Sequence, residues 1–189
     1  MKYKLLLLTI IATLVTYYIY SKYYHMEINI TSINGYAINN NYNESLSNEI
    51  TNNNLNYKLN VDYSSSDLEI ENLIALINNN ANKIQSVIHN SEVIILSIGN
   101  IDMKTETTKV ILQEYKKLFI LLRKYNNKQI IILSPIAFKN ISDLKELCRE
   151  YNLNFINTSS YINDYSSMDA LTLSNSKKLA HAIIKNIAY

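Results

Sequence analysis

Two short, uninterrupted apolar runs constrain the fold of this chain more than any other feature. They are Glu92–Ile98, with the sequence EVIILSI, and Gln129–Leu133, with the sequence QIIIL. A strand with one face in water alternates apolar and polar residues, whereas a strand of a parallel sheet is covered on both faces and is apolar throughout. The two runs therefore predict central strands of a parallel sheet.

Further strands and helices alternate along the chain. Alternating residues predict strands over Glu27–Ser32 and Tyr57–Tyr63, and a short strand over Asn154–Asn157. Helical patterns stand between the strands, over residues 44–51, 68–77, 82–89, 105–125, 142–151 and 174–188. Strands separated by helices form a parallel sheet that is covered on both faces. We therefore expect an α/β fold, a flavodoxin-like three-layer α/β/α sandwich with a five-stranded parallel sheet.

The N-terminal segment has a different character. Residues 5–21 carry no charge, follow Lys2 and Lys4, and end before Lys22. A helix of this length spans roughly 25 Å, slightly less than the hydrocarbon core of a bilayer. We expect residues 1–25 to be a membrane anchor with one transmembrane helix, and residues 26–189 to be a domain outside the cytoplasm. A cleaved signal peptide and a buried helix are the alternatives, although no small-residue cleavage site follows the run.

Composition excludes several classes of protein. The formal net charge of +2 over 189 residues is too small to indicate a nucleic-acid partner. The single cysteine, Cys148, excludes an intrachain disulfide and a cysteine-based zinc site. No glycine-rich loop suggests nucleotide or flavin binding, and no spacing of oxygen ligands suggests a metal. We therefore expect no cofactor.

Loops at the carboxyl ends of parallel strands form the functional site of such folds, and two of these loops carry a recognisable pattern. The first predicted strand ends at Ser32, after Ile30 and Thr31. The sequence Gly99-Asn100-Ile101-Asp102 follows the buried strand over 92–98. The order and spacing of these blocks resemble those of the SGNH, or GDSL-like, hydrolases. In that family the nucleophilic serine ends the first strand in a Gly-Asp-Ser block, and a G-x-N-D block follows a later strand.

Two more blocks extend the resemblance to residues 26–189. The family's second block contains a glycine that donates to the oxyanion, and Ser64 lies in that region here. Its last block, D-x-x-H, precedes the C-terminal helix; this chain keeps Asp169 and has Thr172 at the histidine position. The resemblance implies that Ser32 attacks an ester, that Asp169 orients a base, and that Gly99, Asn100 and Ser64 contact the oxyanion or substrate.

The missing histidine weakens the catalytic prediction. A serine hydroxyl is a poor nucleophile unless a base accepts its proton, and histidine is the usual base. We interpret His25, His89 and His181 as surface or structural residues, with His181 as a candidate displaced base.

Two functions therefore remain open. The first is a membrane-anchored extracytoplasmic esterase that acts on an ester-bearing glycan or lipid. The second is a non-catalytic relative that binds an envelope glycan, lipid or protein.

Overall fold

Five strands form one parallel sheet, as predicted. The computed structural model describes residues 9–19, 27–35, 40–53, 55–61, 63, 65, 68–79, 83–136, 138–162 and 172–187. The strand order is β2-β1-β3-β4-β5, and every neighbouring pair is parallel. The strands are β1 (Ile28–Asn34), β2 (Tyr57–Asn60), β3 (Val93–Ser97), β4 (Gln129–Leu133) and β5 (Asn154–Ile156).

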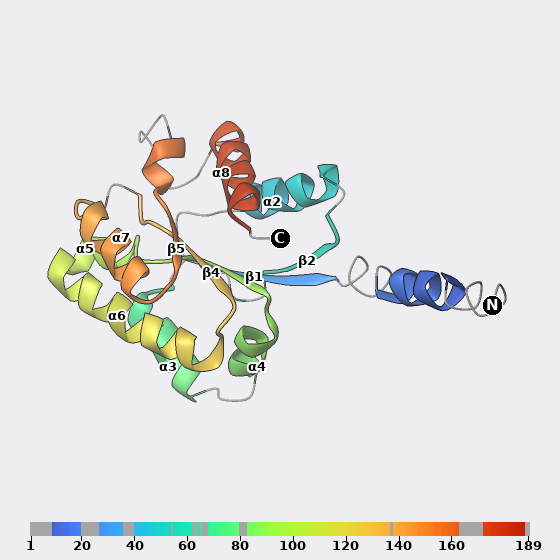
Figure 1. The fold of residues 1–189 in the computed structure, drawn as a ribbon. Helices are drawn as coiled ribbons and strands as arrows, with labels where there is room; N and C mark the ends of the chain where they lie inside the picture. The colour runs from blue at the N-terminus through green and yellow to red at the C-terminus, as the bar shows by residue number, and fades with distance from the viewer. Residues whose placement is uncertain are drawn as a thin grey trace.

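Helices cover both faces of the sheet, which gives the expected three layers (Figure 1). One face packs against α2 (Asn40–Asn52) and α8 (Leu173–Asn186). The other face packs against α3 (Ile70–Asn79), α4 (Lys83–Asn90), α6 (Thr108–Tyr125) and α7 (Ile141–Glu150). Two short helices, α5 (Asp102–Thr105) and η1 (Thr158–Tyr161), follow β3 and β5.

The strand β3 shows why a continuous apolar run is needed at the centre. Ile94 and Leu96 point into the core on the side of α3 and α6, whereas Val93 and Ile95 point into the core beneath α2 and α8. All five residues of the strand are buried. Complete burial of one such side chain contributes about 2 kcal/mol, so a polar residue at most positions of this strand would be costly.

Several boundaries differ from the prediction. The strand β1 continues two residues beyond Ser32 and ends at Asn34, because it stays paired with β3 as far as Ser97. The helix predicted over 105–125 begins later, at Thr108 of α6, and a separate short helix, α5, ends before it at Thr105. The two helices are separated at Thr107, whose side chain accepts a hydrogen bond from the backbone N–H of Val110 and so begins a new helix.

The N-terminal segment is helical over residues 9–19, and all of these residues are exposed. Among the described residues, no helix combines the length and the apolar character needed to cross a bilayer. The predicted span, residues 5–21, lies partly outside the described residues. Residues 1–8 and 20–26 lie outside the described part of the chain.

Candidate functional site at the carboxyl edge of the sheet

Ser32 lies inside the sheet and not in the loop after it. It pairs with Ile95 of β3, has no exposed surface, and faces the layer of α2 and α8. Its Oγ donates a hydrogen bond to Oδ1 of Asn34, 3.1 Å away. Burial raises the pKa of the phenol of Tyr42, which lies beside Ser32, so this phenol stays protonated and cannot accept the proton of Ser32. A sealed hydroxyl of this kind does not fit the nucleophile's role that the resemblance implies.

The end of β1 is held by a short chain of amide contacts. The amide Nδ2 of Asn34 donates to Oδ1 of Asn43 on α2, over 3.1 Å. The backbone N–H of Gly35 donates to the carbonyl of Ser97, over 2.6 Å.

Residues 35–39, which follow the strand, contain no serine, threonine or cysteine. The place directly after the first strand, where the family has its nucleophile, therefore lacks the usual nucleophilic residue types in this chain.

Gly99 and Asn100 form a tight turn after β3, as the sequence predicts. Gly99 has a φ angle of +99°, in a region that favours glycine. A Cβ at this position would lie 2.6 Å from the hydroxyl oxygen of Tyr115, which itself donates to the carbonyl of Ile98. The Oδ1 atom of Asn100 accepts a hydrogen bond from the backbone N–H of Ile136, over 2.8 Å. Within the described residues, its amide Nδ2 has no hydrogen-bond partner, which leaves the two N–H donors of this group unused.

Asp102 accepts a hydrogen bond from the N-terminus of a distant helix, α3. Its Oδ1 accepts a hydrogen bond from the backbone N–H of Ile70, the first residue of α3, over 3.1 Å. Its Oδ2 is buried and has no partner in the described part of the chain. Burial is the main cause that raises the pKa of this carboxyl group. The contact joins residues 32 positions apart, so local sequence patterns give no signal for it.

The edge beyond β4 and β5 is closed by hydroxyl and amide contacts. The Oγ of Ser134 accepts from the backbone N–H of Thr158, over 3.0 Å, and donates to Oδ1 of Asn157, over 3.4 Å. Thr172, at the position of the family's histidine, begins α8. Its hydroxyl accepts from the backbone N–H of Asn175, over 3.3 Å. Thr172 is therefore a helix N-cap here.

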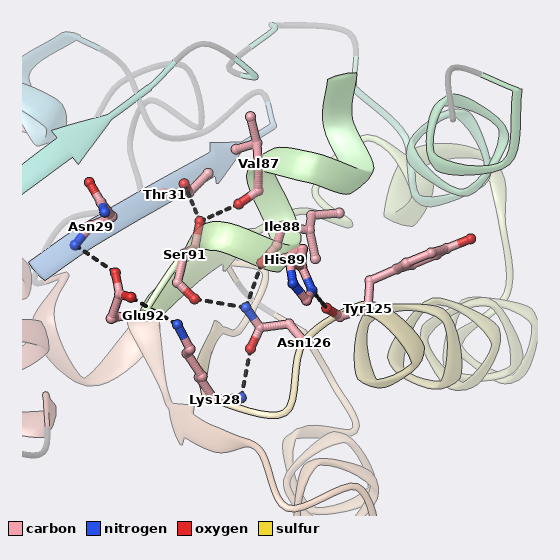
Figure 2. Close-up of polar contacts among 10 residues, drawn as sticks. All are labelled: Asn29, Thr31, Val87, Ile88, His89, Ser91, Glu92, Tyr125, Asn126 and Lys128. Atoms are coloured by element: carbon pink, nitrogen blue, oxygen red, sulfur yellow. Dashed lines mark hydrogen bonds and ion pairs between the residues drawn. The ribbon is translucent and has the colours of Figure 1, made fainter. Parts of the chain in front are cut away.

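The two described histidines contact groups other than Ser32. Asp169 and Ser64 lie outside the described residues, as does His25. The ring Nδ1 of His89 contacts the carbonyl oxygen of Tyr125, 3.2 Å away, at the opposite, amino edge of the sheet (Figure 2). The Nδ1 of His181 contacts Glu49 Oε1, 2.6 Å away, and so joins α8 to α2. Neither of the two described histidines lies at the carboxyl edge.

Comparisons with known proteins agree with this fold. No family model matches the chain, and no curated protein matches its sequence. The solved structure of a family 3 carbohydrate esterase of Clostridium thermocellum superposes with a TM-score of 0.66, at 13% identity, over 85% of this chain and 94% of that one. The lipase Lip_vut3 from a goat rumen metagenome gives a TM-score of 0.59 at 11% identity, over 84% and 96%.

In a third comparison, this chain spans about half of the solved structure that it matches. The N-terminal part of BF1531 from Bacteroides fragilis, which contains a phosphatase domain, gives a TM-score of 0.54 at 11% identity, over 85% of this chain and 53% of that one. At these identities the likeness concerns the fold alone. The chain therefore has the hydrolase-like α/β fold that the lipase and the carbohydrate esterase share.

Proposed function

We propose that this chain is a non-hydrolytic domain of SGNH-like fold, which binds a ligand at the carboxyl edge of its sheet and does not cleave an ester. One observation carries the proposal: the Ser32 hydroxyl is fully buried and donates to Asn34. The histidine position is held by Thr172, which caps α8. Attack on an ester needs an accessible nucleophile and a base within hydrogen-bond reach, and Ser32 has neither among the described residues.

The chemistry of the edge favours an uncharged, hydroxyl-bearing ligand such as an envelope glycan. Amide and hydroxyl groups dominate the strand ends, at Asn34, Asn100, Ser134 and Asn157. The Nδ2 of Asn100 offers a hydrogen-bond donor that no described residue uses. The similarity of the fold to a carbohydrate esterase is consistent with a glycan. Lipid and protein partners are the competing possibilities.

The proposal also places the domain at a membrane surface. The support is the uncharged run of residues 5–21 and the exposure of every residue from 9 to 19. Extraction of membranes with alkaline carbonate tests this part. We expect the full chain to stay in the membrane pellet, and release into the supernatant would contradict the anchor.

Loss of hydrolysis is tested with a fluorophosphonate probe and a short-chain aryl ester. We expect the full chain to show neither labelling nor turnover above that of its Ser32→Ala variant, from pH 5 to pH 9. Labelling that depends on Ser32 would show that the edge opens in solution and would support the esterase instead.

Binding is tested by calorimetry with an oligosaccharide of N-acetylglucosamine. Asn100→Asp keeps an acceptor for the Ile136 N–H but removes the free donor, so we expect at least a tenfold loss of affinity. Asn127→Asp makes the same chemical change in an exposed turn at the amino edge and serves as the matched control. Equal binding by both variants would contradict the assignment of the site.

A further inference from the structure

One face of the β1–β2 pair is polar where a covered parallel sheet is normally apolar. The register pairs Asn29 with Lys58 and Thr31 with Asn60. Paired residues of neighbouring parallel strands point to the same face, so these four side chains share the face on the side of α4. The other face of the same strands is apolar and packs toward α2 and α8, through Ile28, Ile30, Tyr57 and Leu59.

A hollow of about 430 Å³ lies over this polar face. The strands line it with Asn29, Thr31, Lys58, Leu59 and Asn60. Val87 and Asn90 of α4, and Ser91 directly after that helix, line it from the other side. It is located at the amino edge of the sheet and shares no lining residue with the carboxyl-edge site. Figure 2 shows Asn29 and Thr31 on β1 beside Val87 and Ser91.

The hydrogen bonds around the hollow leave several groups available. The hydroxyl of Ser91 donates to the carbonyl of Val87, over 2.6 Å. Thr31 and Ser91 are also in contact, with 2.6 Å between their hydroxyl oxygens, so Thr31 is the donor in that pair and keeps its own acceptor capacity. Among the described residues, neither the side-chain amide of Asn29 nor the ammonium of Lys58 has a partner.

The charges around the hollow favour a ligand with a single negative charge. Lys58 is the single charged side chain in its lining. The carboxylate of Glu92 accepts from the backbone N–H of Asn29 over 3.0 Å and is paired with Lys128 over 2.8 Å. The hollow also lies at the C-terminal end of α4, where the helix dipole is negative and opposes a doubly charged phosphate.

We propose that this hollow binds a sugar acid, a sugar ring that carries one carboxylate. The ammonium of Lys58 would pair with the carboxylate. The exposed amide of Asn29 would bind ring hydroxyls, above the buried Thr31 and Ser91 at the base of the hollow. This second site is independent of the carboxyl-edge site and does not require the proposed function to be correct.

The test measures binding of methyl glucuronide, methyl glucoside and glucose 6-phosphate to the full chain. Calorimetry is done in a polyoxyethylene detergent, because a detergent with a sugar headgroup would compete. We expect methyl glucuronide to bind most tightly, and its affinity to fall in 0.5 M salt. Lys58→Met keeps the aliphatic stem and removes the charge, so it should weaken glucuronide binding at least tenfold. Asn29→Asp places a like charge beside the carboxylate and should abolish this binding.

Lys145→Met is the matched control, because Lys145 is an exposed lysine on α7, outside the lining of the hollow. It should leave the glucuronide affinity unchanged. Equal affinity for glucuronide and glucoside, an unaffected Lys58→Met variant, or no binding of either sugar at millimolar concentration would overturn the proposal. Tighter binding of glucose 6-phosphate would overturn the choice of a carboxylate. These outcomes are separate from those of the hydrolysis assay and of the Asn100→Asp binding test, so the two proposals can fail independently.

Discussion

Replacement of Asp102 by asparagine tests the electrostatics of the carboxyl edge directly. Asp102 is 4% exposed, and its Oδ1 accepts from the first N–H of α3 while Oδ2 has no partner among the described residues. Burial raises the pKa of this carboxyl, the hydrogen bond from Ile70 lowers it, and the charges of Glu69 and Glu106 add to the increase. Asparagine has the same shape and keeps an oxygen for Ile70, but it cannot ionise.

The sign of the pH dependence of stability follows from the protonation state of Asp102 that the folded chain prefers. A folded-state pKa above the unfolded value of about 3.9 means that the fold favours the protonated acid. The stabilisation by Asp102 is therefore complete below about pH 3.9 and is lost as the pH rises through the folded-state pKa. Each pKa unit between the two states corresponds to about 1.4 kcal/mol of unfolding free energy. Asp102→Asn should therefore gain stability relative to the native chain as the pH rises from 4 to 8.

Urea unfolding followed by tyrosine fluorescence measures this difference, because the chain has 16 tyrosines and no tryptophan. Asp102→Ala serves as the control, since it also removes the acceptor for Ile70 and should cost about 1 kcal/mol relative to Asp102→Asn at every pH. The reasoning is refuted if the difference between Asp102→Asn and the native chain is flat, or falls, between pH 4 and pH 8. That result would mean that the N-terminus of α3 fully stabilises the charge.

Three further predictions concern stability and reactivity. Burial raises the pKa of Cys148 to about 12, so its thiol should react with a disulfide reagent at pH 8 only after unfolding in urea; rapid labelling of the native chain would contradict this. Gly99→Ala should lower the unfolding free energy by about 2 kcal/mol, because Gly99 has a positive φ and an added Cβ would meet Tyr115. A loss under 0.5 kcal/mol would contradict this prediction. Arg123→Lys should cost about 2 kcal/mol in the same assay, since the guanidinium donates to four backbone carbonyls; an unchanged urea midpoint would contradict that role.

The candidate site could be predicted only in part. Gly99 and Asn100 lie in a turn after β3. The sequence predicts this turn because the apolar run of the strand ends directly before Gly99. The sequence predicts that Ser32 ends its strand, because the alternation of Glu27–Ser32 stops there. The extension to Asn34 depends on pairing with Ser97, which is distant in sequence. The capping of α3 by Asp102 likewise depends on a contact between distant segments.

The sequence by itself determined the layers of the fold. Continuous apolar runs can be buried only as central parallel strands, and helical periodicity between them requires crossovers on both faces. Tertiary structure alone decided what surrounds each polar residue. Ser32 and Thr31 are adjacent in one strand and both are buried, yet Ser32 lies beneath α2 whereas Thr31 lies under a hollow beside α4. The reason is that successive residues of a strand point to opposite faces, and only the packing of helices decides what each face meets.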